Sequence, residues 1–140
     1  MKGIVFTELL DMAEQAVGED VVDDILNSLA LENDGAYTSV GNYPCSELMQ
    51  IVGALSDHTG TPVEDLQRQL GAWMLKRLAL SYPDFFVGKE TALDMLDAIE
   101  NEVHVEVRKL YPEAELPSFL TRRPDAQSIE MIYRSDRPLA

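Results

Sequence analysis

Three anion-binding side chains stand at alternate positions near the end of the chain: Tyr133, Ser135 and Arg137, in the stretch YRSDR. Side chains two residues apart on a β-strand point to the same side, so a phenol, a hydroxyl and a guanidinium would face one way. All three donate hydrogen bonds, and the guanidinium is permanently charged. The pattern indicates a receptor for the carboxylate or phosphate edge of a ligand. Periodicity alone favours a simpler alternative, a solvated strand end with Arg137 paired to Asp136 or Glu130.

A second candidate for chemistry is His104, which falls on the flank of an apolar helical stripe, beside Glu100 and Tyr111. A lone helical histidine is usually a satisfied or solvent-facing side chain. A single imidazole that faces an apolar pocket is nevertheless enough to hold haem iron from one side. Haem is an apolar disc with two carboxylates on one edge, so His104 and the Tyr133-Ser135-Arg137 triplet suit the two ends of one ligand.

The elements that must position these residues are mostly helical. Apolar residues recur at helical spacing before Gly18, between positions 21 and 29, between 48 and 55, and after the helix-start motif Thr61-Pro62-Val63-Glu64. A further stripe predicts one helix from Thr91 to Tyr111, which carries His104. Segments 118–122 and 128–135 predict two strands joined by a turn. The expected fold class is therefore α+β, a helical N-terminal subdomain followed by a short antiparallel β portion.

Composition narrows the function. The chain has 140 residues, 25 of them acidic and 11 basic, with a formal net charge of -14. Such a surface repels phosphate backbones and anionic lipids, so we expect neither nucleic acid nor membrane as a partner. The single cysteine, Cys45, predicts a cytoplasmic location and is more typical of a helix start than of a nucleophile. Catalytic groupings such as Ser-His-Asp are missing from the sequence, so an enzyme is not expected.

Three segments together resemble one known family. They are MKGIVF from Met1 to Phe6, VHVEVRKLYPEAELPSF from Val103 to Phe119, and YRSDRPL from Tyr133 to Leu139. The chain resembles the H-NOX (haem-nitric oxide/oxygen binding) domain, which is found in bacterial gas sensors and at the start of soluble guanylate cyclase. The last segment fits the Tyr-x-Ser-x-Arg signature of that family, and the resemblance covers the whole chain.

The resemblance implies a single H-NOX-like domain over residues 1–140 that encloses a haem pocket. Its parts would be a mostly helical region 1–88, a helix with the proximal histidine in 89–111, and a β hairpin with the propionate-binding motif in 112–140. His104 would be the axial ligand to the iron of haem b (iron protoporphyrin IX), and Tyr133, Ser135 and Arg137 would hydrogen-bond the propionates. Pro117 would press on the haem plane. Val5, Leu9, Met74 and Leu78 would line the far side.

The resemblance also implies a sensor that catalyses no reaction. In the family, nitric oxide binds the iron, the iron–histidine bond weakens, and a partner reads the resulting shift, typically a histidine kinase or a cyclic-di-GMP enzyme. The four apolar residues on the far side donate no strong hydrogen bond, which bound oxygen needs. We therefore expect a nitric oxide sensor that excludes oxygen, with carbon monoxide as a further candidate gas.

Family members continue beyond the signature through a further helix and two strands, whereas this chain stops at Ala140. We therefore expect a C-terminally incomplete form, and the tyrosine that confers oxygen binding in some members would lie beyond that end. One alternative stays open, a cofactor-free acidic helical domain that binds a partner protein. It explains the net charge of -14 equally well, but not the triplet at positions 133, 135 and 137.

Overall fold

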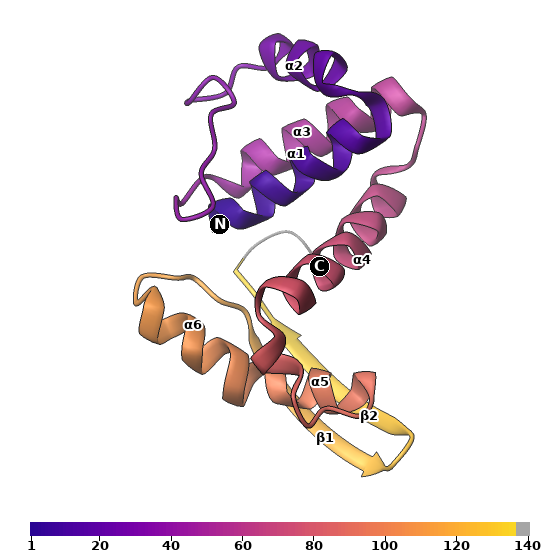
Figure 1. Ribbon diagram of the computed structural model, residues 1–140, viewed down its shortest axis with the longest axis vertical. Coiled ribbons are helices and arrows are strands. Elements are labelled where there is room, and N and C mark those ends of the chain that lie inside the picture. Colours follow the sequence, from indigo (N-terminus) through magenta and orange to yellow (C-terminus); the bar gives the residue numbers. More distant parts are fainter. Residues whose placement is uncertain (137–140) are drawn as a thin grey trace. The chain divides into compact units, whose positions relative to one another are not determined.

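The computed structural model describes residues 1–136, and the chain divides into two compact units, Met1–Leu78 and Ala79–Ala140 (Figure 1). Helices come first and a two-stranded antiparallel sheet comes last. This order confirms the α+β class that the sequence predicts. Within residues 1–136, no helix combines the length and the apolarity that a membrane span requires.

The first unit is built from helices that match the predicted apolar stripes. They are α1 (Gly3–Val17), α2 (Glu19–Ser28), α3 (Cys45–Thr59) and α4 (Val63–Ser81), whose last turn extends into the second unit. Gly18, at φ 93°, separates α1 from α2 in a conformation that glycine adopts without strain. Cys45 is the first residue of α3, as the sequence indicates.

In the core of the first unit, each helix packs one apolar face against the others. Phe6 and Leu9 of α1 are fully buried, and Phe6 stacks on Tyr37 with ring centroids 4.5 Å apart. Burial of one such side chain stabilises the fold by about 1.5–3 kcal/mol. The other buried members of this cluster are Ala13, Val22, Ile25, Leu31, Leu48, Ile51, Val52, Leu55, Leu66 and Leu70.

The second unit holds a helical stretch and a hairpin. A 3-10 turn, η1 (Pro83–Phe86), precedes α5 (Ala92–Ala98), the π-helix η2 (Ile99–Val103) and α6 (His104–Leu110). The helix predicted from Thr91 to Tyr111 is therefore confirmed over Ala92–Leu110, but its middle, Ile99–Val103, is π-helical rather than α-helical. The hairpin follows, with β1 (Ser118–Asp125) paired to β2 (Ser128–Arg134).

The strand boundaries differ from the predicted ones at both strands. β1 continues past Arg122, through a bulge, to Asp125, and β2 ends at Arg134 rather than Ser135. Asp125 closes the turn with its own side chain, because its two carboxylate oxygens accept from Gln127 N at 2.8 Å and from Ser128 Oγ at 2.7 Å. An Asp side chain that bonds the backbone two residues on is a turn former, and this shortens the predicted turn.

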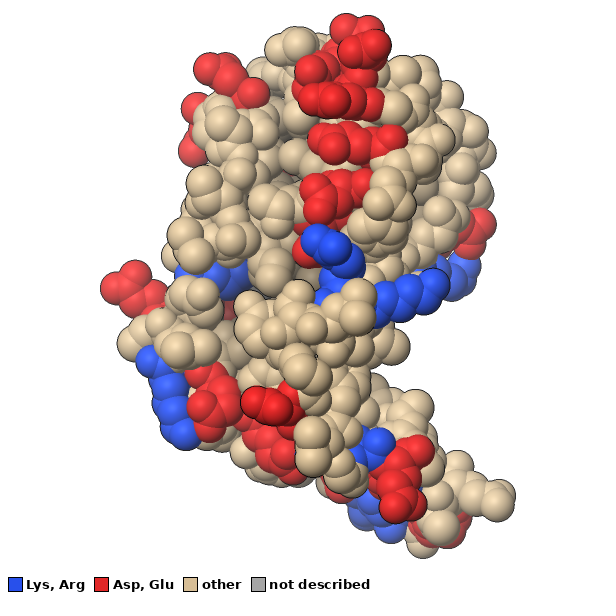
Figure 2. Space-filling model, viewed as in Figure 1, with Lys and Arg blue, Asp and Glu red and all other residues tan. Residues whose placement is uncertain are grey.

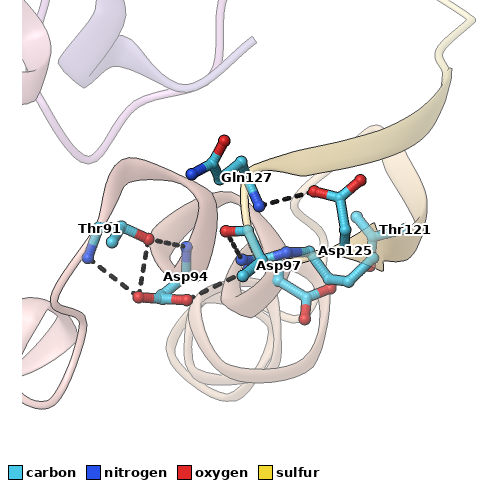
Figure 3. A network of polar contacts seen from close by, with 8 residues as sticks. Thr91, Asp94, Asp97, Thr121, Asp125 and Gln127 are labelled. Carbon is cyan, nitrogen blue, oxygen red and sulfur yellow. Dashed lines mark hydrogen bonds and ion pairs between the residues drawn. The ribbon is translucent and has the colours of Figure 1, made fainter.

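A polar network fastens α5 to the hairpin (Figure 3). Thr91 and Asp94 form a reciprocal capping box: Asp94 N donates to the Thr91 hydroxyl, and Thr91 N donates to the Asp94 carboxylate at 2.9 Å. The same carboxylate accepts from Arg123 of β1 at 3.1 Å, and the Thr121 hydroxyl of β1 donates to Asp97. The segment that leads into His104 is therefore held at its start by both a cap and the sheet.

Candidate functional site

His104 is the first residue of α6, directly after the π-helix, and only 7% of the residue is exposed. Its backbone N–H donates to the carbonyl of Ile99, five residues earlier, which is the π-type bond. Single π-turns inside α-helices occur frequently at functional sites. The buried histidine and the irregular turn therefore lie at the same place in the chain.

One nitrogen of the His104 ring is anchored by a carboxylate. Nδ1 lies 3.0 Å from Oε2 of Glu100, one turn earlier. A carboxylate can only accept here, so Nδ1–H is the donor and Nε2 is the ring nitrogen left for a metal. Within residues 1–136, no hydrogen bond engages Nε2. A neutral imidazole with one nitrogen fixed by a carboxylate and the other open is the usual arrangement of a metal-ligating histidine.

Glu100 joins three parts of the second unit. Its Oε2 also accepts from the backbone N–H of Phe119 at 3.2 Å, and its Oε1 accepts from Arg108 at 2.9 Å. The Arg108 hydrogen bond, followed by those from His104 and Phe119, lowers the pKa of Glu100 to about 2 against a weaker effect of burial. The carboxylate beside His104 is therefore ionised at neutral pH.

The Phe119 ring lies between His104 and Tyr133. Its centroid is 5.5 Å from that of the His104 imidazole and 5.4 Å from that of the Tyr133 phenol. Phe119 and Tyr133 are also opposite each other in the register of β1 and β2. The hairpin thus connects the predicted iron ligand to the predicted propionate-binding motif through one aromatic side chain.

Tyr133 and Ser135 line the same hollow in the surface, of about 460 Å³. On β2, Ile129 and Met131 are half-buried and Glu130 and Ile132 are exposed, as the predicted alternation requires. The alternation of burial stops at Tyr133, which is exposed like its neighbours Ile132 and Arg134, and Ser135 beyond the strand is half-buried. Tyr133 is 39% exposed. Arg137, the third member of the triplet, lies outside the described residues. The hollow is lined by Leu116, Ser118, Tyr133, Arg134, Ser135 and Asp136.

Two further observations concern the triplet. Pro117 is half-buried and stands between Leu116 and Ser118, both of which line the hollow. Glu130, one of the partners considered for Arg137, instead takes Arg122 in a two-pronged pair with distances of 2.7 to 2.9 Å.

The four apolar residues predicted for the far side of haem all belong to the first unit. Leu9 is fully buried in its core, Val5 and Met74 pack against that core, and Leu78 is half-buried in α4. None of these side chains carries a hydrogen-bond donor. Their role as one wall of a pocket stays a prediction.

The sequence analysis did not single out Glu100, which contacts His104 in the structure. The spacing of four residues between Glu100 and His104 was visible and is the spacing at which helical side chains meet. What the spacing does not reveal is that Arg108 and the Phe119 amide hold the carboxylate in place. The π-turn was missed as well, because nothing in the apolar periodicity of 91–111 marks it.

The donor set of the second unit fits haem. One buried imidazole offers an open Nε2 for a metal, and two hydroxyl groups, those of Tyr133 and Ser135, border one hollow and suit carboxylates. An iron held in haem does not need a cluster of protein ligands, since the porphyrin itself supplies four nitrogens.

Comparison with known proteins points the same way. The model of the family described as Haem-NO-binding matches residues 2–140. The fold is similar to the unliganded Fe(II) H-NOX protein from K. algicida, with 42% identity and a TM-score of 0.88 over 97% of this chain and 74% of that one. It is also similar to the H-NOX from Shewanella woodyi in its Fe(II)CO state, with 39% identity and a TM-score of 0.84 over 100% of this chain and 74% of that one.

A third similar structure is the H-NOX protein from S. oneidensis in its Fe(II)NO state, with 29% identity and a TM-score of 0.86 over 97% of this chain and 75% of that one. No curated protein matches the chain. The family match favours the sensor over the cofactor-free interaction domain, because the family is one of haem-binding sensor domains. The chain belongs to the Haem-NO-binding (H-NOX) family, and its cofactor is haem.

Proposed function

We propose that this H-NOX chain is a nitric oxide sensor in which His104 is the axial ligand to haem iron. The observation that carries the assignment is the state of the His104 ring: buried, fixed at Nδ1 by Glu100, and open at Nε2. The other histidine, His58, is exposed in the last turn of α3. Of the two, only His104 has the surroundings of a metal ligand.

Tyr133, Ser135 and Arg137 are proposed to hydrogen-bond the haem propionates. Tyr133 and Ser135 border the same hollow, which supports a shared anionic ligand for them. Charge-assisted hydrogen bonds of this kind contribute about 1.5–3 kcal/mol each. Pro117, beside the same hollow, is proposed to press on the haem plane because its ring is rigid and adds no donor there.

Haem held by these residues would supply a ferrous iron able to bind a diatomic gas. Val5, Leu9, Met74 and Leu78 are proposed to border the gas. Because none of them donates a hydrogen bond, they favour nitric oxide over oxygen, which needs a donor. His104, the proposed iron ligand, is connected to β1 by Glu100, whose Oε2 contacts His104 Nδ1 and accepts from the Phe119 backbone N–H.

We further propose that a partner protein, a histidine kinase or a cyclic-di-GMP enzyme, reads the change. A sensor of this kind needs a gas that favours one arrangement of the protein over another. The Phe119 ring contacts both His104 and Tyr133. Through these contacts, a change in the position of the His104 imidazole would change the position of the hairpin residues Phe119 and Tyr133. The chain itself is proposed to catalyse no reaction.

Replacement of His104 by glycine tests the ligand. We expect His104→Gly to lose the absorption bands of the histidine-ligated ferrous protein and to regain them when imidazole is added, since free imidazole can enter the space that the side chain leaves. His58→Gly is the matched control, because it removes the other histidine from an exposed position, and its spectrum should not change. An unaltered spectrum of His104→Gly without imidazole would refute the assignment.

Gas selectivity is a separate test. We expect the ferrous protein to shift its Soret band with nitric oxide and with carbon monoxide, and to show no stable oxygen complex in air. Placing a tyrosine hydroxyl at Leu78 or Met74 should create oxygen binding if these positions border the gas. A stable oxygen complex of the unaltered protein would show that the selectivity proposal is wrong while leaving the ligand assignment untouched.

A further inference from the structure

Resting on the proposal that His104 is the axial ligand, we infer that Glu100 is a positioning residue that sets the strength of the metal–histidine bond, with Arg108 moderating it. Glu100 is well placed for this role because its Oε2 lies 3.0 Å from His104 Nδ1 and 3.2 Å from the backbone nitrogen of Phe119. Two donors on one oxygen fix the carboxylate, and the carboxylate in turn fixes the plane of the imidazole.

The charge of the acceptor gives the effect its direction. An anionic acceptor draws the Nδ1 proton toward itself, which makes Nε2 a stronger donor to a metal. Arg108 donates to the other carboxylate oxygen, Oε1, at 2.9 Å and so reduces the negative charge available to the imidazole. Glu100 and Arg108 therefore act on the metal–histidine bond in opposite directions, and this opposition distinguishes tuning from general structural support.

The contact between Glu100 and His104 is more buried than an ordinary surface ion pair, which suits an effect of Glu100 on the metal–histidine bond. The side chain of Glu100 is 24% exposed and that of His104 is 9% exposed, so solvent screens their contact only partly. The nearby acids, Glu102 and Glu106, pair instead with Lys89 and Lys109, and their side chains are 56% and 48% exposed. Of Glu100, Glu102 and Glu106, Glu100 is thus the least exposed.

The test is the iron–histidine stretching band in the resonance Raman spectrum of the ferrous, haem-loaded chain, together with the fraction of the nitric oxide complex that is five-coordinate. Glu100→Gln keeps an oxygen acceptor but removes the charge, so the band should move to lower frequency and the five-coordinate fraction should rise. Arg108→Gln should move the band to higher frequency and lower that fraction. Glu100→Ala, which removes the acceptor altogether, should weaken haem binding by about 10–100-fold.

Two variants serve as controls with the same charge changes. Glu102→Gln and Lys109→Gln remove one acid and one base from exposed neighbours, and both should leave the band where it is. The inference is overturned if Glu100→Gln behaves as Glu102→Gln does, or if Glu100→Gln and Arg108→Gln shift the band in the same direction. Should Glu100→Gln fail to take up haem, Arg108→Gln decides alone, since it leaves the Glu100–His104 contact in place.

The outcomes also separate this inference from the proposed function. If His104→Gly loses the histidine-ligated spectrum while Glu100→Gln leaves the band unchanged, the ligand assignment stands and the role of Glu100 is wrong. If His104→Gly leaves the spectrum unchanged, the proposed function fails first.

Discussion

Among the residues that the structure describes, Glu47 and His104 are the buried side chains with polar or ionisable groups, and their surroundings differ in kind. Both carboxylate oxygens of Glu47 are engaged, one by the Tyr37 hydroxyl at 2.7 Å and one by the backbone nitrogen of Glu32 at 2.9 Å. His104 has a partner at Nδ1 and, within residues 1–136, none at Nε2. A fully satisfied buried group indicates a structural role, whereas an open nitrogen indicates a ligand.

The structural role of Glu47 can be measured. Replacement by alanine leaves the Tyr37 hydroxyl and the Glu32 amide without their acceptor, so we expect Glu47→Ala to lower the free energy of unfolding by about 1–3 kcal/mol. Burial, and then Glu47 itself, raises the pKa of Tyr37; the variant should bring the pKa of this phenol down toward its usual value. Urea denaturation and a spectroscopic titration of the tyrosines check both results.

The control for Glu47→Ala is Asp57→Ala, because Asp57 is an exposed acid of the same helix, α3. Such surface substitutions change stability by less than about 0.5 kcal/mol. If the two variants unfolded at the same urea concentration, the hydrogen bonds of Glu47 with the Glu32 amide and the Tyr37 hydroxyl would contribute nothing to the free energy of unfolding.

At the level of helices and strands, the spacing of apolar residues predicted an element best where that element only had to bury one face. The apolar stripes of α1 to α4 predicted those helices because each packs one face on a common core. The segment 99–103 is different: it is π-helical, and its Glu100 contacts both His104 and the backbone N–H of Phe119 on β1. Local periodicity has no signal for such contacts, so the sequence predicted the helix and its histidine but not the break.

The start of α5 yields a prediction about an element. Thr91→Ala removes the hydroxyl that accepts from Asp94 N and donates to its carboxylate at 2.8 Å, so the capping box is lost (Figure 3). Loss of such a cap costs about 0.5–2 kcal/mol. The Thr91 hydrogen bond is the leading cause of the lowered pKa of Asp94, ahead of the one from Arg123, so that pKa should rise in the variant.

Chemical denaturation and an NMR titration of the Asp94 carboxyl measure the two effects of Thr91→Ala. Thr91→Ser keeps the hydroxyl and should behave like the unaltered chain in both measurements. An Asp94 pKa that did not move in Thr91→Ala would contradict the network drawn in Figure 3, in which the Thr91 side chain bonds the carboxylate directly.

For the whole molecule, the sequence predicted the class, the order of elements and the family, but not where the chain divides. The compact units meet at residues 78 and 79, inside α4. The regions 1–88, 89–111 and 112–140 expected from the resemblance are divisions by type of element within one domain, and they predict no such boundary. An uninterrupted helical pattern gives no sign of a boundary, because the division depends on which residues pack together in space. The assignment of all 140 residues to one domain stays a prediction.

Acidic residues are spread over the whole chain, but their local settings differ between the units. In the first unit, Figure 2 shows Asp and Glu side chains gathered on the face in view. There, burial and then the neighbours Asp11, Glu19 and Asp23 raise the pKa of Glu14. In the second unit, hydrogen bonds from Thr91 and Arg123 lower the pKa of Asp94, and those from Ser128 and Gln127 lower the pKa of Asp125.

These opposite shifts predict that acid affects the two units differently. A carboxyl whose pKa is lowered by folding contributes stability that is present above its unfolded pKa, about 3.9 for Asp, and lost as the pH falls toward the folded value. Protonation of Asp94 and Asp125 therefore lowers the stability of the second unit below about pH 4. Glu14 has the opposite sign: its protonation, which begins above the usual value of about 4.3, removes first the cost of burying its charge and then the repulsion from Asp11, Glu19 and Asp23 in the folded state.

Hydrogen exchange read residue by residue between pH 6 and pH 3, corrected for the intrinsic rate, measures each unit separately. We expect protection in α5, β1 and β2 to fall below about pH 4, while α1 and α2 keep theirs longer. Asp94→Asn should flatten the pH dependence in the second unit only, and Glu14→Gln should change it in the first unit only. If protection fell equally in both units and neither substitution changed that fall, total charge rather than these local contacts would govern the response to acid, because each substitution removes only one charge from a chain with a net charge of -14.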